Sequence, residues 1–182
     1  MKNVRWEISA GAVLLFALMY FFDGSGCVSA LLPAVAVHEL GHWIPLRLCQ
    51  KPIRRVALGV FGLRIDYGGR LEGRRALACV GGGPAAGLVY ALAACALGGD
   101  FWRMSGALSF VLSIFTLLPV LPLDGGRLIA AVTDARFAAR LSRIAAALLT
   151  LGGAFIALRW HAFALLIAGI WLCIANFRSP LL

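Results

Sequence analysis

Six apolar runs, separated by short polar segments, make up most of this 182-residue chain. A helix needs about 20 mainly apolar residues to cross a bilayer. Most of the runs come close to that length, although the first and the fifth are short. We therefore expect an all-α polytopic membrane protein with about six transmembrane helices. The expected spans are residues 8–22, 24–46, 76–99, 104–123, 141–158 and 160–177.

The composition excludes an ordinary water-soluble domain. Hydrophobic residues make up 62% of the chain, whereas soluble domains contain about 45–50%, and the mean hydropathy is +0.90. The formal net charge of +9 would suit nucleic-acid binding. The basic residues stand between the apolar runs, however, and the chain contains no nucleic-acid motif. The expected partner is therefore a lipid bilayer and not nucleic acid.

The distribution of basic residues predicts an orientation. If the N-terminus is cytosolic, the arginine-rich segments after the second and fourth runs also lie inside, and only Arg103 and Arg159 lie outside. This bias follows the positive-inside rule and predicts a multi-pass protein of the cell (inner or plasma) membrane with both termini cytosolic. The basic start and the Val28-Ser29-Ala30 sequence also resemble a cleaved secretory signal. In that alternative five spans would remain.

Residues 56–67, in the segment after the second run, form a short stretch that differs from the spans. They are rich in β-branched and aromatic residues, with Gly59 and Gly62 as breaks. The stretch is too short to cross a membrane as a helix, and its composition predicts a β-hairpin. An amphipathic loop is the alternative. The five cysteines form no CxxC pair, and we expect neither disulfides nor a cysteine metal site.

The second run contains the motif His38-Glu39-Leu40-Gly41-His42. On a helix, residues four apart share one face, so His38 and His42 can hold one metal ion. Glu39 is close enough to reach a metal-bound water as a general base. Ionisable side chains inside a membrane are costly, and function is their first interpretation. A polar cluster satisfied by neighbouring helices is the alternative.

A catalytic zinc ion usually has three protein ligands, and the third has to come from elsewhere in the chain. His161 is expected at the outer interface. Asp124 ends the fourth run, where Pro119 and Pro122 interrupt helical hydrogen bonding. The second and fourth runs cross in the same direction, so Asp124 is expected near the cytosolic side together with the histidines. A turn that ends a helix is the alternative role for Asp124.

Together, residues 38–42 and the segment Leu121-Pro-Leu-Asp-Gly-Gly126 resemble the motifs of the site-2 protease family of intramembrane metalloproteases. The small size and the early HExxH are most similar to its sporulation-type branch. The resemblance covers roughly residues 34–128. It implies zinc bound by His38, His42 and Asp124, with Glu39 as the catalytic base.

The same resemblance implies partners and substrates. It implies hydrolysis of membrane-tethered proteins, such as a sigma-factor precursor or an anti-sigma factor, and membrane regulatory proteins as partners. It also implies that the hairpin at residues 56–67 is membrane-associated and binds unwound substrate. The fourth-run motif is expected to contact substrate through Thr116, Pro119, Pro122 and Gly125.

Two positions depart from the family pattern. Thr116 and Gly87 stand where the family commonly has asparagine. Thr116 keeps a hydroxyl group for a polar contact, whereas Gly87 keeps no side chain. Gly83 and Gly87 form a small-xxx-small pair that lets helices approach closely, so we interpret this stretch as helix packing.

We expect residues 1–182 to form a single intramembrane metalloprotease domain, without the C-terminal regulatory domain of many sporulation-type relatives. Two other functions fit parts of the pattern. A metal transporter would place several ligands along a path, and the sequence shows one cluster. A catalytically inactive scaffold or binding protein with a structural metal site would explain the two departures at Thr116 and Gly87.

Overall fold

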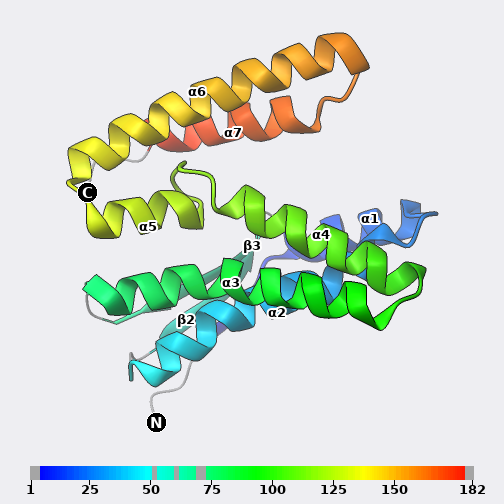
Figure 1. Ribbon diagram of the computed structural model, residues 1–182, viewed down its shortest axis with the longest axis horizontal. Coiled ribbons are helices and arrows are strands. Elements are labelled where there is room, and N and C mark those ends of the chain that lie inside the picture. Colours follow the sequence, from blue (N-terminus) through cyan, green and yellow to red (C-terminus); the bar gives the residue numbers. More distant parts are fainter. Residues whose placement is uncertain (1–4, 51–52, 60–61, 69–72, 179–182) are drawn as a thin grey trace. The chain divides into compact units, whose positions relative to one another are not determined.

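The computed structural model describes residues 5–50, 53–59, 62–68 and 73–178. These residues are mostly helical, with one small sheet (Figure 1). They form two compact units, Met1–Ser113 and Ile114–Leu182, and α4 runs across the boundary between them. The elements in chain order are β1 (Arg5–Ile8), α1 (Ala10–Phe22), α2 (Cys27–Leu48), β2 (Ile53–Gly59), β3 (Gly62–Tyr67), α3 (Gly73–Leu97), α4 (Asp100–Thr116), α5 (Asp124–Val132), α6 (Ala135–Trp160) and α7 (Ala164–Arg178).

Among the described residues, three helices are long and apolar enough to cross a membrane, namely α2, α3 and α6. They correspond to the second, third and fifth predicted spans. Two further helices, α1 and α7, are apolar but shorter. A predominantly helical protein with three helices suited to cross a membrane is thus confirmed, and the count of six spans stays a prediction.

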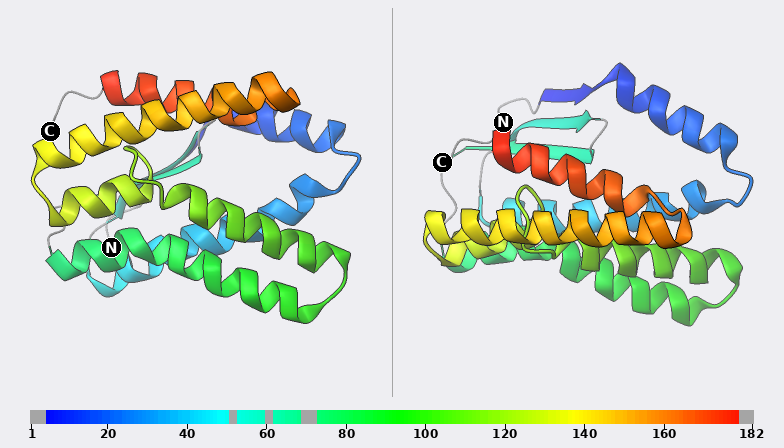
Figure 2. Two further views of the ribbon diagram at one scale, coloured as in Figure 1. Left: turned by 45° about the horizontal axis from the view of Figure 1, so that its top comes forward. Right: turned by 90° about the horizontal axis from the view of Figure 1, so that it is seen from above.

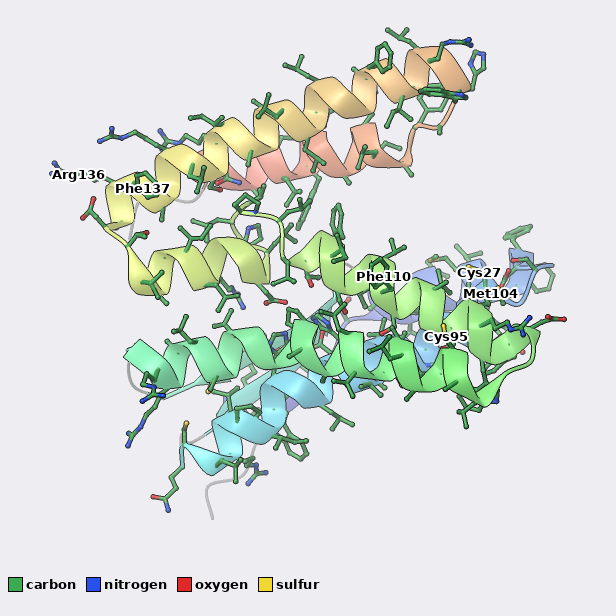
Figure 3. All side chains as sticks on the ribbon, in the orientation of Figure 1. Cys27, Cys95, Met104, Phe110, Arg136 and Phe137 are labelled. Atoms are coloured by element: carbon green, nitrogen blue, oxygen red, sulfur yellow. The ribbon has the colours of Figure 1, made fainter. Side chains whose placement is uncertain are left out.

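The helices bury small residues and expose large apolar ones, as expected where lipid is the solvent. Ala34 and Gly41 are buried on α2, and Ala91 and Ala94 on α3. Large side chains such as Phe110 on α4 and Phe137 on α6 stand on the outside of their helices (Figure 3). Lipid removes the hydrophobic drive between helices, so close backbone approach through small residues takes its place.

The first unit contains a three-stranded sheet in the order β1-β2-β3. The antiparallel pairing of β2 with β3 confirms the predicted hairpin, and the amphipathic-loop alternative is wrong. Residues 60–61 of that stretch lie outside the described residues. β1 was not predicted. It pairs in parallel with β2, and Glu7 forms an ion pair with Arg55.

The first span was predicted to start too early, because its first residue belongs to β1. Ile8 belongs to this strand, and α1 begins only at Ala10, with the Ser9 side chain accepting a hydrogen bond from the Ala12 N–H. Polar and apolar residues alternate in Arg5-Trp6-Glu7-Ile8, which is the period of a strand. The hydropathy of the following helix masked this short pattern.

The helices α3 and α4 of the first unit meet along a row of serines. Ser105, Ser109 and Ser113 are fully buried at intervals of four residues. The Ser109 hydroxyl donates to the Gly87 carbonyl oxygen at 2.9 Å, and Tyr90 and Ser105 share a hydrogen bond of 2.8 Å. Hydrogen bonds between helices stabilise such contacts in an apolar environment.

The second unit contains α5, α6 and α7 together with the loop that precedes α5. The helices α6 and α7 lie side by side (Figures 1 and 2). The predicted fourth span, residues 104–123, is wrong over its last third, because α4 ends at Thr116 and residues 117–123 form a loop. Pro119 and Pro122 lack the N–H groups that a helix needs. Val120, in this loop, packs with Ala146 of α6 and Leu172 of α7.

Candidate metal centre

The helix that carries the histidines, α2, crosses α3 so closely that the two backbones are in contact. A Cβ atom on Gly41 would overlap the carbonyl oxygen of Gly82, and one on Gly82 would overlap the carbonyl oxygen of Gly41. Only glycine at both positions permits this approach. The crossing lies beside His42 in the sequence and brings the imidazoles of α2 against α3.

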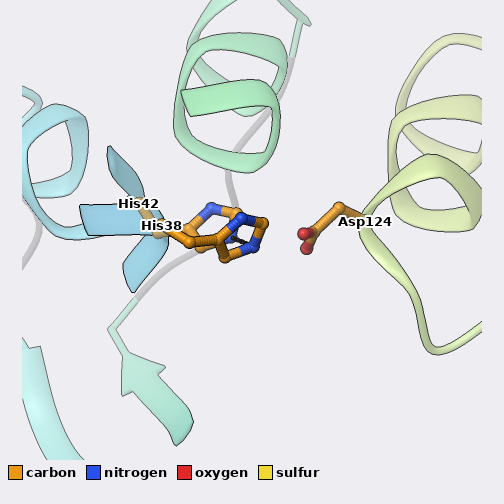
Figure 4. Close-up of side chains that lie close together, drawn as sticks. All are labelled: His38, His42 and Asp124. Carbon is orange, nitrogen blue, oxygen red and sulfur yellow. Dashed lines mark hydrogen bonds between the residues drawn. The ribbon is translucent and has the colours of Figure 1, made fainter. Parts of the chain in front are cut away.

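His38 and His42 present their Nε2 nitrogens to the same point. The two Nε2 atoms are 3.3 Å apart, and the ring planes are inclined at 79° (Figure 4). Two nitrogens bound to one tetrahedral zinc ion at 2.0–2.1 Å lie about 3.3–3.4 Å apart. The separation is therefore the one that two ligands of a single zinc ion adopt.

The backbone of α3 orients the His42 ring. Its Nδ1 atom lies 2.9 Å from the carbonyl oxygen of Cys79. A carbonyl oxygen only accepts, so Nδ1 carries the proton and the Nε2 lone pair of the neutral ring points toward His38. Such a contact to the second ring nitrogen is the usual way in which a protein fixes a metal-binding histidine.

Two glycines of α3 leave space for neighbouring side chains, Gly83 for His42 of α2 and Gly87 for Ser113 of α4. A Cβ atom on Gly83 would overlap the His42 imidazole. One on Gly87 would overlap the Ser113 Oγ atom and lie 3.6 Å from Nδ1 of His38. The interpretation of this pair as packing is confirmed, and Gly87 stands where no larger residue fits beside Ser113.

His38 is almost completely buried, with 4% of its surface exposed, and Glu39 is half-buried on the same helix. A buried and a half-buried imidazole beside a carboxyl group can bind a divalent cation and exchange protons with a water held there. The role of Glu39 as a general base stays a prediction.

Asp124 is the first residue of α5 in the second unit, and only 9% of its surface is exposed (Figure 4). The following glycines pack on the preceding loop. A Cβ atom on Gly125 would overlap the Leu117 carbonyl, and one on Gly126 would lie 2.5 Å from the carbonyl carbon of Val120. The glycines thus let the loop pack tightly on the first turn of α5, which begins with Asp124.

Two residues that the sequence analysis missed hold this loop. The Leu121 N–H donates to the Ser142 Oγ atom at 2.8 Å, and the Asn176 side-chain amide donates to the Leu121 carbonyl oxygen. Ser142 lies on α6 and Asn176 on α7. Asn176 is one of only two asparagines in the chain and stands in an apolar run. A polar amide side chain within that apolar run was the feature of the sequence that could have identified this residue.

The other predicted site residues lie around the same loop. Thr116 ends α4 and is half-buried, as is Pro119, while Pro122 is exposed and Gly125 is buried. Their substrate contacts stay predictions. His161 is exposed at the end of α6 in a left-handed conformation, in keeping with the interfacial position expected for it.

Comparison with known proteins points to one class, the metallopeptidases. Residues 98–160 match the family described as Peptidase family M50. The chain is 30% identical, over 86% of its length, to "Putative zinc metalloprotease Rip3" of Mycobacterium tuberculosis strains Erdman and H37Rv. It spans 44% of the length of those relatives.

The fold is similar to that of a solved structure, the Site-2 Protease from Methanocaldococcus jannaschii. The TM-score is 0.68 at 16% sequence identity, over 98% of this chain and 91% of that chain. The M50 match, the similarity to Rip3 and this shared fold together confirm the resemblance to the site-2 protease family that was inferred from the two motifs. The sporulation-type branch stays a prediction.

Proposed function

We propose that this protein is an intramembrane zinc metalloprotease that hydrolyses peptide bonds of membrane-tethered proteins. The observation that carries the proposal is the pair of Nε2 nitrogens 3.3 Å apart, one of them oriented by the Cys79 carbonyl. The similarity to M50 peptidases and to Rip3 supports the same activity.

In this proposal Asp124 is the third protein ligand, beside His38 and His42. Two imidazoles and one carboxylate are a common donor set for catalytic zinc, with the fourth position left for water. Asp124 is the buried carboxylate of the Leu-Pro-Leu-Asp-Gly-Gly segment. A nearby cation would offset the cost of burying its charge.

In this proposal, the metal and Glu39 have separate roles in peptide-bond hydrolysis. Bound zinc supplies Lewis acidity at the attacking water and at the scissile carbonyl. Glu39 accepts the proton of that water and delivers it to the leaving amide nitrogen. Since Glu39 adjoins His38 in the sequence, the base and a ligand are placed by the same turn of α2.

Substrate is proposed to bind in extended form, because a helix hides its peptide bonds. The sheet formed by β1, β2 and β3 offers outer strands for such pairing. Thr116, Pro119, Pro122 and Gly125 are proposed to contact the chain near the metal. The proposed location is the cell membrane with cytosolic termini, and the substrate class is that of sigma-factor precursors or anti-sigma factors in regulated intramembrane proteolysis, including sporulation.

The first test is the zinc content of the purified protein in detergent. Wild type should hold about one zinc ion, and Asp124→Ala and the double variant His38→Ala/His42→Ala should lose it or bind it weakly. His161→Ala is the matched control and should keep the wild-type content. A well-folded wild type that holds no zinc after metal is supplied would overturn the proposal. Zinc unaffected by Asp124→Ala would remove this residue from the ligand set.

The second test separates catalysis from binding. Glu39→Gln should keep zinc and hold a membrane-tethered substrate without cutting it, so it can also serve to trap the substrate. Cleavage of the trapped protein by wild type, and not by the variant, would support the base assignment. A fully zinc-loaded wild type that binds the substrate without cleavage would favour the inactive scaffold.

A further inference from the structure

The loop before Asp124 is held by both peptide groups of Leu121. Its N–H donates to Ser142 of α6 at 2.8 Å, and its carbonyl oxygen accepts from the Asn176 amide of α7 at 2.5 Å. The other described N–H groups of this loop, at Leu118, Val120 and Leu123, donate to backbone oxygens a few residues earlier. Leu121 is thus the point at which α6 and α7 hold the loop.

The two side chains that hold Leu121 also bind each other. The Ser142 hydroxyl donates to Oδ1 of Asn176, and the Asn176 amide donates a further hydrogen bond to the Leu172 carbonyl oxygen at 2.9 Å. Ser142 is fully buried and Asn176 is 8% exposed. The hydroxyl proton, both amide protons and Oδ1 are all engaged. A fully satisfied buried network specifies one arrangement and resists alternatives.

The position of Leu121 fixes the position of Asp124, three residues later. Val120 is buried against Ala146 and Leu172, so the loop lies on α6 and α7. Its backbone in turn contacts Gly125 and Gly126 in the first turn of α5. If the loop moved, it would collide with the first turn of α5 or leave that turn without support. The position of the start of α5 therefore depends on the position of the loop.

We propose that Ser142 and Asn176 are positioning residues that set the Asp124 carboxylate for metal binding by holding the Leu121 peptide groups. The inference rests on the proposed function, because it takes Asp124 as a ligand. Neither residue is among the proposed metal ligands or substrate contacts. Residues that orient metal ligands typically affect affinity by about 10–100-fold when they are replaced.

The test compares three variants by two measurements. Ser142→Ala and Asn176→Leu each remove the polar groups with little change in size, and Thr150→Val is the matched control. Thr150 is also a hydroxyl residue on α6, and it bonds to the Ala146 carbonyl oxygen and the Cys173 Sγ atom. Zinc affinity is measured by competition with a chelator. Hydrogen exchange at the Leu121 amide is measured on the metal-free protein.

If the inference holds, Ser142→Ala and Asn176→Leu bind zinc about 10–100-fold more weakly and exchange the Leu121 amide faster, while Thr150→Val changes neither. Faster exchange with unchanged zinc affinity overturns the inference, as does equal weakening in Thr150→Val. A wild type that binds no zinc overturns the proposed function instead. The exchange data from the same samples still show whether these side chains hold the loop.

Discussion

The Nδ1 nitrogen of His42 on α2 lies 2.9 Å from the Cys79 carbonyl oxygen on α3. This contact predicts that the neutral His42 ring carries its proton on Nδ1 even without metal. The measurement is the ¹⁵N chemical shifts of the ring in the metal-free protein, with exposed His161 as reference. A ring protonated on Nε2 would contradict the orienting role of the Cys79 carbonyl.

Gly83→Ala should abolish tight metal binding. The added methyl group would overlap the His42 imidazole, so the ring must turn away from His38 or α3 must move. Overpacking of this kind costs about 1–3 kcal/mol. Zinc content and thermal stability are the measurements.

The control for Gly83→Ala is Gly152→Ala on α6. A Cβ atom at Gly152 meets nothing within 4 Å, and alanine in a helix is favoured over glycine by about 0.5–1 kcal/mol. Gly152→Ala should therefore be neutral or slightly stabilising, with its zinc retained. Equal zinc content in the two variants would show that Gly83 does not make room for the metal-binding ring.

Gly87 and Ser113 should be energetically coupled. Gly87→Ala overlaps the Ser113 Oγ atom and should destabilise by about 1–3 kcal/mol. Combining it with Ser113→Gly removes the clash, so the double variant should lose less stability than the sum of the single variants. A double-mutant cycle of unfolding free energies in detergent measures this coupling. Additive losses would mean that the two helices move apart instead.

We expect α2 to become less stable in acid, because Asp23 then loses its charge. Hydrogen bonds from the Ser25 hydroxyl, at 2.6 Å, and from the Val28 N–H hold the pKa of Asp23 below its usual value of 3.8. A carboxyl group with a lowered pKa stabilises the fold above its unfolded pKa, and this contribution is lost as the pH falls through the folded pKa.

The measurement for Asp23 is the thermal stability of wild type and Asp23→Asn between neutral pH and about pH 3. The wild-type advantage should be constant near neutrality and shrink below the usual carboxyl range. The same advantage at both ends would show that the charge of Asp23 contributes nothing.

Sequence patterns predicted the parts of this protein that follow strict periods. The spacing of His38 and His42 predicted their shared helix face, and the composition of residues 56–67 predicted the hairpin now seen in β2 and β3. The four-residue strand β1 was not predicted, because its alternation of polar and apolar residues is shorter than the window over which hydropathy is informative. The fourth span was extended over residues 117–123 because this loop is as apolar as a helix.

Residues whose role depends on partners distant in sequence could not be assigned. Ser142 and Asn176 are 34 residues apart and meet at Leu121 only in the folded chain. Gly87, interpreted from sequence as a departure from the family, is explained by a serine 26 residues later whose side chain occupies the adjacent space. A single sequence contains the two residues but not their contact.

The contact between Gly41 and Gly82 also limits how the first unit can move. Helices that touch through side chains can shift as rotamers change, whereas helices whose peptide groups touch cannot shift in this way. α2 and α3 are therefore held together as one rigid pair, which keeps both histidines in place beside the Cys79 carbonyl oxygen.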